Sequence, residues 1–406
     1  MSAEKLPPVH FFGLDIHKHY LVAIGVDPDG SQVYGPRRVV WADLESWRSK
    51  TLAPQDAVVI EMTTNTWQVY DELQPFVHSV TVVHPPHVRL VTQPQVMNDK
   101  IAAFNLALLL AKGMLTGVWI PPLEVRERRA LLAQRSKMTR LSTQAKNRLH
   151  AVLHRHHLLP CEGDLFHPDR RNWWLALPLS PIEKVRVFSD LETLAFARSQ
   201  VDNLEACVRQ IAAQDSRLPW LVQLPGISVL NALSILAAIG DIDRFPDAKH
   251  LVGYAGLGSR VHDSGQSTRT GKITKTGRRD LRAALVEAAQ VAANTHPHWQ
   301  AELARLEPRL GRNKAIVAIA RKLLIAVWHT LSEQVADRHA VPARVTRKLL
   351  QVAYTLGKEN RPKDLSAAAL VRQQLDQLHI AQEVTHIPWG SKKRPIPLPP
   401  SALPPD

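Results

Sequence analysis

The sequence predicts an α/β domain followed by a mainly helical region. Short β-rich apolar runs, with one helical stretch between them, occupy the first 85 residues, and long stretches with leucines at helical spacing follow residue 120. Pro121-Pro122 separates the two parts. Seven prolines among the last twenty residues preclude helix or sheet there, so we expect residues 388–406 to form a disordered or extended tail.

The strands of the α/β domain are predicted from apolar runs bounded by polar residues. Residues 10–16 and 20–26 should form a hairpin around a polar turn. The other elements that we expect here are strands at 38–41, 57–62 and 80–83, a helix at 67–73, and a long apolar helix at 99–117 with Asn98 as its N-cap.

A basic amphipathic helix is predicted over residues 124–157, where nine Lys and Arg residues stand among leucines. A second helix over 182–213 has apolar residues at three- and seven-residue intervals. The two can pair as an antiparallel coiled coil or across a dimer, or form one hairpin in a monomer, and the sequence favours neither. The candidate nucleic-acid-binding residues of the first helix are Arg126, Arg129, Lys137, Arg140 and Arg148.

A third region begins at Trp220, contains an Ala/Leu/Ile-rich helix that ends near Gly240, and continues to about residue 329; a further helix is expected at 348–356. The predicted division of the chain is an α/β domain at 1–120, a helical segment for dimerisation and RNA binding at 121–215, a third domain at 216–335, a helical extension at 336–387 and the tail at 388–406.

The chain of 406 residues carries a formal net charge of +14, and its sequence pI is near 10.0. Such an excess favours an anionic partner, first of all nucleic acid, over a merely basic soluble surface. Two distant cysteines without a CxxC pattern indicate a reducing cytoplasm. The N-terminal residues lack a signal-peptide pattern, and the apolar stretch 101–114 is too short to cross a bilayer, so we expect no membrane partner.

Three carboxylates stand at unusual places in the α/β domain. Asp15 interrupts an apolar strand, Glu61 ends another, and Asp99 opens a helix. Singly they read as a hairpin-end acid, a strand-edge charge and a helix cap. Together, oxygen ligands from distant segments are what a hard divalent cation requires, and Mg²⁺ is the expected metal.

The segments around these acids resemble a known family. Residues 13–18, Ile60-Glu61 and residues 98–103 are similar to the catalytic segments of the RuvC-like, RNase H-fold domain of the insertion sequence 110 transposases, which carry an Asp-Glu-Asp-Asp set. The family pattern puts the fourth carboxylate at position 102, where this chain has Ala102. The chain is thus a natural divergent member or an inactivated copy, and we favour the second because the flanking residues match so well.

A second constellation lies in the third region. Between residues 269 and 282 there are six Lys or Arg and one acid, interleaved with glycine and small hydroxyl residues that suit phosphate binding. A serine in such a loop can donate to phosphate or act as a nucleophile. Residues 224–228 read as the hairpin of a helix-hairpin-helix or as an ordinary turn. The candidate phosphate-binding residues are Gly226, Gly265, Arg269, Lys272, Lys275, Arg278 and Arg279.

This region resembles the second domain of the same family, a mainly helical serine transposase domain in which the serine before a glycine is the nucleophile. The resemblance assigns that role to Ser264, with Ser267 as the fallback. It implies an enzyme that recombines donor and target DNA through a phosphoserine, with Mg²⁺ at Asp15, Glu61 and Asp99. It further implies guidance by a bridge-type non-coding RNA, a homodimer that assembles to a tetramer on DNA, and a prokaryotic cytoplasm near the nucleoid.

Two other classes of function stay open at this point. A Mg²⁺-dependent nuclease or junction resolvase would use the carboxylates to activate water, and a non-catalytic nucleic-acid scaffold would fit Ala102. The histidine groups His84-Pro-Pro-His87 and His154-Arg-His156-His157 lack Cys or acidic partners at ligand spacing, so we do not expect metal there.

Overall fold

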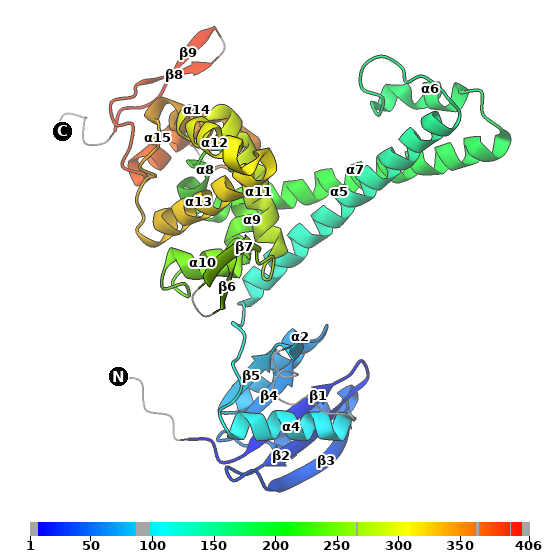
Figure 1. Cartoon of the computed structure of the whole chain (residues 1–406), viewed down its shortest axis with the longest axis vertical. Coiled ribbons are helices and arrows are strands. Elements are labelled where there is room, and N and C mark those ends of the chain that lie inside the picture. The colour runs from blue at the N-terminus through cyan, green and yellow to red at the C-terminus, as the bar shows by residue number, and fades with distance from the viewer. Residues whose placement is uncertain (1–6, 87–97, 265–266, 363–364, 390, 400–406) are drawn as a thin grey trace. The chain divides into compact units, whose positions relative to one another are not determined.

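The computed structural model describes residues 7–86, 98–264, 267–362, 365–389 and 391–399, except for the side chains of residues 261–270 and 389. The chain divides into an N-terminal unit, Met1–Pro121, and a C-terminal unit, Pro122–Asp406 (Figure 1). The prediction of a mixed α/β domain followed by a mainly helical region is confirmed. The finer division into five segments remains a prediction.

A five-stranded mixed sheet organises the N-terminal unit. Its order is β3-β2-β1-β4-β5, with β1 antiparallel to β2 and parallel to β4. This arrangement is consistent with the expected RNase H-like domain. The strands are β1 (Phe11–Ile16), β2 (Tyr20–Val26), β3 (Gln32–Val40), β4 (Ala57–Glu61) and β5 (Ser79–Val83).

Helices cover both faces of this sheet. On one face lie α1 (Leu44–Thr51) and α2 (Thr66–Leu73), with the short helices η1 (Trp41–Asp43) and η2 (Gln74–Phe76) at their ends. On the other lies α4 (Asp99–Ala111), which packs on β1, β2 and β4 (Figure 1).

Helix α4 begins as predicted, because the Asn98 side chain accepts a hydrogen bond from the amide of Ile101 at 2.9 Å. It ends at Ala111, earlier than the predicted residue 117. Gly113, at φ 64°, adopts the left-handed conformation that commonly terminates helices, and this glycine is the signal that the prediction missed.

Gly13 sets how closely α4 approaches the sheet. A Cβ atom at this position would lie 2.0 Å from the carbonyl oxygen of Ala103 and 2.6 Å from the amide nitrogen of Ala107. Both atoms belong to the helix backbone, so no side-chain rotation could relieve the overlap. The absence of a side chain at Gly13 therefore allows the helix to rest directly on β1.

A long helical hairpin begins the C-terminal unit. It consists of α5 (Leu123–Arg155) and α7 (Pro181–Gln214), joined through η3 (Pro168–Arg170) and α6 (Arg171–Ala176). The ion pairs Arg148–Asp190 at 2.6 Å and Arg155–Glu183 at 2.9 Å show that the two helices run antiparallel. The pairing of the two predicted helices thus occurs within one chain.

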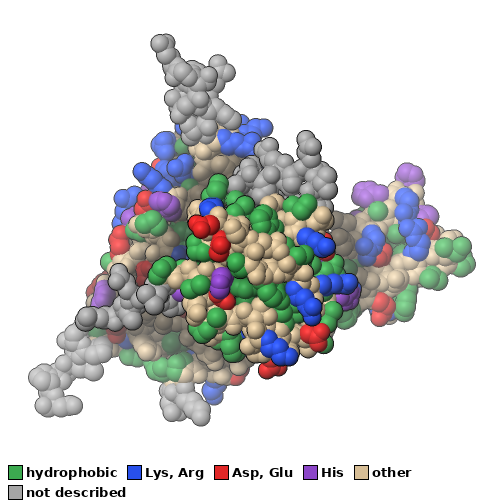
Figure 2. All heavy atoms as spheres, turned by 90° about the horizontal axis from the view of Figure 1, so that it is seen from below, with side chains coloured by type: hydrophobic (Ala, Val, Ile, Leu, Met, Phe, Trp, Pro, Cys, Tyr) green, Lys and Arg blue, Asp and Glu red, His purple; other side chains and the backbone are tan. Residues whose placement is uncertain are grey.

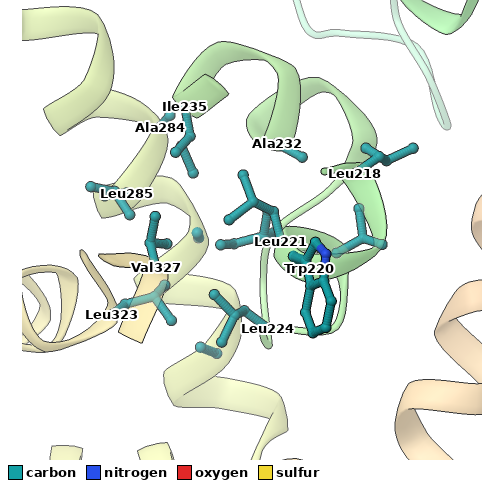
Figure 3. Packing of buried hydrophobic residues seen from close by; sticks show 14 of the residues in the cluster. Leu218, Trp220, Leu221, Leu224, Ala232, Ile235, Ala284, Leu285, Leu323 and Val327 are labelled. Carbon is teal, nitrogen blue, oxygen red and sulfur yellow. The ribbon is translucent and has the colours of Figure 1, made fainter. Parts of the chain in front are cut away.

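The remaining helices share one apolar core. Figure 3 shows Leu221 and Leu224 packed against Leu285 and Leu323, which come from distant parts of the sequence. The core helices are α8 (Leu218–Val222), α9 (Val229–Ile239), α10 (Ala248–Tyr254), α11 (Arg279–Thr295), α12 (Pro297–Leu310), α13 (Arg312–Ser332), α14 (Pro342–Leu356) and α15 (Ala367–Gln377).

Helix α13 is, among the described residues, the helix whose length and apolar composition would suffice to cross a membrane. Half of the apolar stretch is buried in the structure, and Ile319, Leu323 and Val327 belong to the shared core. In this structure it is a core helix of the bundle.

The structure corrects the prediction for the tail. Strands β8 (His386–Trp389) and β9 (Lys392–Pro395) form an antiparallel hairpin where we expected neither helix nor sheet. Proline is tolerated because each strand of a two-stranded hairpin has an edge that needs no donors. The hairpin is anchored, since Ile396 is buried in the core and the guanidinium of buried Arg372 donates to the carbonyl of Pro397 at 2.8 Å.

Replacement of Gly13 by alanine should push α4 away from the sheet. We expect Gly13→Ala to lower the free energy of unfolding by about 1–3 kcal/mol, as overpacking typically does. Thermal or urea unfolding measures the change. Gly253→Ala in α10 is the control, because its added Cβ would meet nothing within 4 Å. Equal stability of the two variants would contradict the close-packing account.

Asp215 anchors the base of the helical hairpin. Its carboxylate accepts hydrogen bonds from Arg128 at 2.6 Å and Arg217 at 2.8 Å, and only 4% of its side chain is exposed. Burial opposes ionisation, but the hydrogen bonds and charge of Arg217, with Arg128, outweigh it and hold the pKa of Asp215 below its usual value. Removal of the charge would leave the two arginines with at most a neutral acceptor in place of their shared carboxylate.

We expect Asp215→Asn to cost about 1.5–3 kcal/mol of stability at neutral pH, the usual range for hydrogen bonds to a charged group. Because the folded-state pKa is depressed, this advantage of the wild type is complete above the unfolded pKa of about 4 and disappears as pH falls through the folded value. Unfolding of both proteins across pH 2–7 tests this, with the exposed Asp202→Asn as control. A difference independent of pH would contradict it.

Candidate metal centre and nucleic-acid interface

Asp15, His17 and Asp99 converge at one end of the N-terminal sheet. The Nε2 atom of His17 lies 3.2 Å from Oδ2 of Asp15 and 3.3 Å from Oδ2 of Asp99. One potential ligand atom from each residue lies within 4.8 Å of the others, and all three residues are partly buried. Carboxylate oxygens and an imidazole nitrogen at such spacing fit a divalent metal site.

The packing of α4 produces this convergence. Asp15 follows Leu14 near the carboxyl end of β1, and Asp99 is the first residue of the helix that rests on Gly13. The Tyr20 hydroxyl, from the next strand, donates to Oδ2 of Asp99 at 3.0 Å. Two carboxylates 84 positions apart in sequence therefore meet because one helix lies directly on one strand.

Glu61 lies at the same end of the sheet. The register pairs Leu14 of β1 with Ile60 of β4, so Asp15 and Glu61 each stand one residue beyond the last paired residues of two parallel strands. Among the described residues, the group within 4.8 Å contains Asp15, His17 and Asp99, and Glu61 is outside it. Its role as a ligand remains a prediction.

The surroundings of the cluster disfavour the ionised form of Asp15. Burial raises the pKa of the Asp15 carboxyl, the Asp99 charge raises it further, and His17 acts in the opposite direction. The hydrogen bond to Asp99 raises the pKa of the Tyr20 phenol, whose ring also lies 3.9 Å from the Arg38 guanidinium. A bound cation would relieve the repulsion between the two carboxylates.

His17 is the residue of this cluster to which the sequence assigned no role. Asp15 and His17 are two positions apart in an extended segment, so their side chains lie on the same side of it. That spacing, with a histidine two residues after a strand carboxylate, is the signal that could have identified it. Ala102, the expected fourth acid position, is half-buried in the first turns of α4, where its amide bonds the carbonyl of Asn98 at 2.9 Å.

Ser264 is the last residue of strand β6 (Ser259–Ser264), which pairs with β7 (Ser267–Ile273) in a hairpin where the sequence suggested a loop. The register places Ser264 opposite Ser267, the fallback nucleophile, so both candidate serines flank the hairpin tip. Gly265 lies outside the described residues, as does His87 of the first histidine group. The backbone of Arg269 lies in β7.

The basic segment after β7 is held against the end of α10. Gly277, at φ 109°, approaches so closely that a Cβ would lie 2.3 Å from the carbonyl oxygen of Tyr254. The amide of Arg278 donates to the same carbonyl at 2.9 Å. This glycine thus serves backbone packing. Lys272 near the end of β7, and Lys275 and Arg279 after it, are exposed.

The predicted basic residues of α5 fall into two groups. Arg148 pairs with Asp190, and Arg129 donates to the carbonyls of Ala237 and Ala238 at the end of α9, at 2.7 and 2.9 Å. Lys137 and Arg140 are exposed, and no ion pair is found for them within the described part of the chain. The hairpin also carries histidines near its tip, which appear with Lys and Arg on the arm at the right of Figure 2.

Several of these basic residues line one groove between α5, α9 and α11. Its volume is about 710 Å³, and Asp280 and Glu287 are the acids on its walls. Arg278 pairs with Asp280 at the mouth. Its basic lining residues are Arg129, Arg135, Arg140, Arg278 and Arg279. Four of these five are residues that the sequence had selected, and they come from two segments about 140 positions apart.

The turn before α9 is tightly constrained. Gly226 has φ 80°, and a Cβ there would lie 1.9 Å from the carbonyl oxygen of Ala288. The Ser228 hydroxyl caps α9 by accepting from the amide of Asn231 at 3.1 Å. Glycine is required at position 226 for its backbone conformation and for its contact with α11.

Two family models match this chain, one over the segment with the carboxylate cluster and one over the segment with Ser264. A family model described as Transposase, of the DEDD type found in IS110 elements, matches residues 12–158. A second, described as Transposase IS116/IS110/IS902 family, matches residues 219–304. The chain belongs to the IS110 family of transposases. The resemblance stated from the sequence is thereby confirmed.

Two relatives of this IS110 transposase align with it over most of their lengths. It is 26% identical over 339 residues to the transposase for insertion sequence element IS1111A of Coxiella burnetii, covering 82% of this chain and 92% of the relative. It is 24% identical to a probable family 20 transposase of Pseudomonas aeruginosa, covering 80% and 98%. A pilin gene-inverting protein of Moraxella bovis is 30% identical over 45% of this chain and 48% of its own.

Asp15→Asn should relieve the repulsion between Asp15 and Asp99 and, separately, remove a ligand for a metal ion. Without metal we expect a small rise in Tm, because a neutral amide relieves the repulsion from Asp99. With added Mn²⁺ or Mg²⁺ the wild type should gain about 2.7 kcal/mol at a hundredfold excess over Kd, and the variant should gain little. Differential scanning calorimetry measures both, with the exposed Asp29→Asn as control. Equal metal-induced shifts in all three proteins would rule out a site at Asp15.

Proposed function

We propose that this IS110 transposase is an RNA-guided DNA recombinase of an insertion sequence, which cuts and rejoins strands through a phosphoserine intermediate. The observation that carries the proposal is the convergence of Asp15, His17 and Asp99 in a chain whose second family segment contains Ser264-Gly265. An acidic cluster suits phosphoryl transfer, and the hydroxyl offers a nucleophile that conserves bond energy.

Asp15, Glu61 and Asp99 would hold Mg²⁺. The metal would supply stabilisation of the negative charge on the oxygens of the phosphate under attack. His17 contacts both Asp15 and Asp99 and would orient their carboxylates toward the same point. Tyr20, by donating to Asp99, would fix the rotamer of the helix carboxylate.

The proposed covalent step conserves the number of phosphoester bonds. The Ser264 oxygen forms a bond to phosphorus while the bond from phosphorus to one sugar oxygen breaks, and that oxygen leaves as a hydroxyl with the proton that serine gives up. In rejoining, a sugar hydroxyl of the new strand attacks the phosphoserine and the proton returns to Ser264. Because each bond broken is matched by one formed, no external energy source is needed.

Backbone contacts would come from the basic groove and the segment after β7. Arg140 in the groove, Lys272 near the end of β7, and Lys275 and Arg279 after it supply positive charge, which suits phosphate contacts to DNA and to a folded bridge RNA. We further propose a homodimer that becomes a tetramer on DNA, so that one subunit's serine can act beside another's carboxylates. A prokaryotic cytoplasm, near the nucleoid, is the compartment that such substrates imply.

Ala102 makes impaired catalysis part of the proposal. An acid at this position would lie one helical turn from Asp99 and on the same side of α4. Its loss removes one of four carboxylates from the family's Asp-Glu-Asp-Asp set and should weaken metal binding. The same residue is the observation that favours the second candidate, a nucleic-acid scaffold without activity.

A trapped-adduct experiment tests the mechanism. DNA carrying the element's ends, its flanking non-coding RNA and Mg²⁺ are incubated with protein, which is then denatured, and the protein–DNA adduct is quantified. We expect an adduct that Ser264→Ala abolishes, Ser267→Ala retains and Ala102→Asp increases. Cleaved DNA without adduct would favour the nuclease, and normal binding without cleavage by Ala102→Asp would favour the scaffold.

A further inference from the structure

A second cavity lies in the C-terminal unit and adjoins the groove described above, since Asn231 and Glu287 line both. It has a volume of about 640 Å³ and lies between the turn at 225–228, helix α11 and helix α14. Helix α14 follows the segment matched by the family model and has no role in the proposed function. The cavity therefore has the candidate helix-hairpin-helix turn on one side and α14 on another. The sequence analysis gave no reason to expect these two segments to lie together.

The wall formed by α14 is basic. Five of the α14 positions that line it, 344, 347, 348, 351 and 355, each lie three or four residues from another of the five, so they share one face of the helix. Three of them are Arg344, Arg347 and Lys348, whereas Glu287 is the acid among the cavity's lining residues within the described ranges. Arg347 is exposed and makes no hydrogen bond or ion pair with other described residues.

Lys348 ties this wall to the turn. Its ammonium group donates to the carbonyl oxygen of Leu224, directly before the Pro225-Gly226 turn. Although part of the side chain reaches solvent, the ammonium group is surrounded by protein, and burial lowers the pKa of Lys348 to about 7. An anion in the cavity would compensate for this cost and stabilise the charged form.

Two buried side chains line the same cavity with unused polar atoms. Gln223 is 3% exposed; its side-chain oxygen accepts from the amide of Asp337 at 3.1 Å, while its Nε2 has no partner among the described residues. His296 is 5% exposed, and its Nδ1 is likewise without a partner. Both atoms are closed off from solvent, so they make the floor of the cavity polar, and contacts with a ligand fall to the exposed side chains of α14.

We propose that this cavity binds the phosphodiester backbone of a nucleic acid, with the first-turn amides of α9 on one wall and the basic face of α14 on the other. Helix α9, capped by Ser228, presents amides that the helix itself does not use, and its positive end favours an anion. The inference rests on the proposed function only in requiring a nucleic-acid substrate. It adds α14 to the binding surface.

Full-length variants of exposed positions on α14 test the proposal. Arg347→Gln removes a cation, Gln351→Glu adds an acid and Gln351→Lys adds a cation to the cavity wall. Arg309→Gln is the matched control, since Arg309 is exposed at the end of α12 and does not line the cavity. Affinity is measured across salt concentrations with a fluorescent DNA duplex and, separately, with an RNA hairpin.

We expect Arg347→Gln and Gln351→Glu to weaken binding several-fold and Gln351→Lys to strengthen it. The slope of log affinity against log salt should fall by about 1 for Arg347→Gln, as for one lost phosphate contact, and Arg309→Gln should match the wild type. If only DNA binding or only RNA binding changes, that result identifies which of the two nucleic acids the cavity binds.

Two results would overturn the inference. Wild-type affinity and salt slope in all three α14 variants, with both probes, would exclude the cavity as a backbone site and leave the proposed recombinase function standing. A wild-type protein that binds neither probe would contradict both the cavity site and the proposed function.

Discussion

The direct contact of α4 with β1 is the constraint on which the candidate metal site depends. Because Gly13 has no side chain, the backbone of α4 approaches the strand closely enough for Asp99, at the helix start, to meet Asp15 and His17. The N-cap at Asn98 and the hydrogen bond from Tyr20 then fix where the helix begins and which way Asp99 points. The packing of α4 on the sheet thus determines the geometry of the candidate metal site.

The same arrangement concentrates negative charge in a partly buried place. The raised pKa of Asp15 reflects burial and the neighbouring Asp99, a cost that a cation would remove. In the C-terminal unit the balance is opposite, since arginines and lysines outnumber acids around both cavities. The N-terminal unit is suited to hold a cation and the C-terminal unit to hold a phosphate backbone. The proposed phosphoryl transfer on nucleic acid would use both.

Much of this could be predicted because periodic patterns fix elements and carboxylates in apolar strands need partners. Asp15 was selected by that rule and Asp99 because it opens a helix, and the structure brings them together. His17 was missed because an imidazole in a polar turn looks ordinary until a helix covers it. The β8–β9 hairpin was missed because proline content describes local preference, whereas Ile396 and Arg372 anchor that segment through tertiary contacts.

We propose that the carboxylates of the N-terminal unit and Ser264 act on the same phosphate. A structure of the assembled protein with DNA, guide RNA and Mn²⁺, located by its anomalous scattering, measures this most directly. We expect Mn²⁺ at Asp15 and Asp99 of one subunit, with the Ser264 hydroxyl of that subunit or its partner beside the same scissile phosphorus. Mn²⁺ elsewhere, or every Ser264 remote from a phosphorus near the metal, would contradict it.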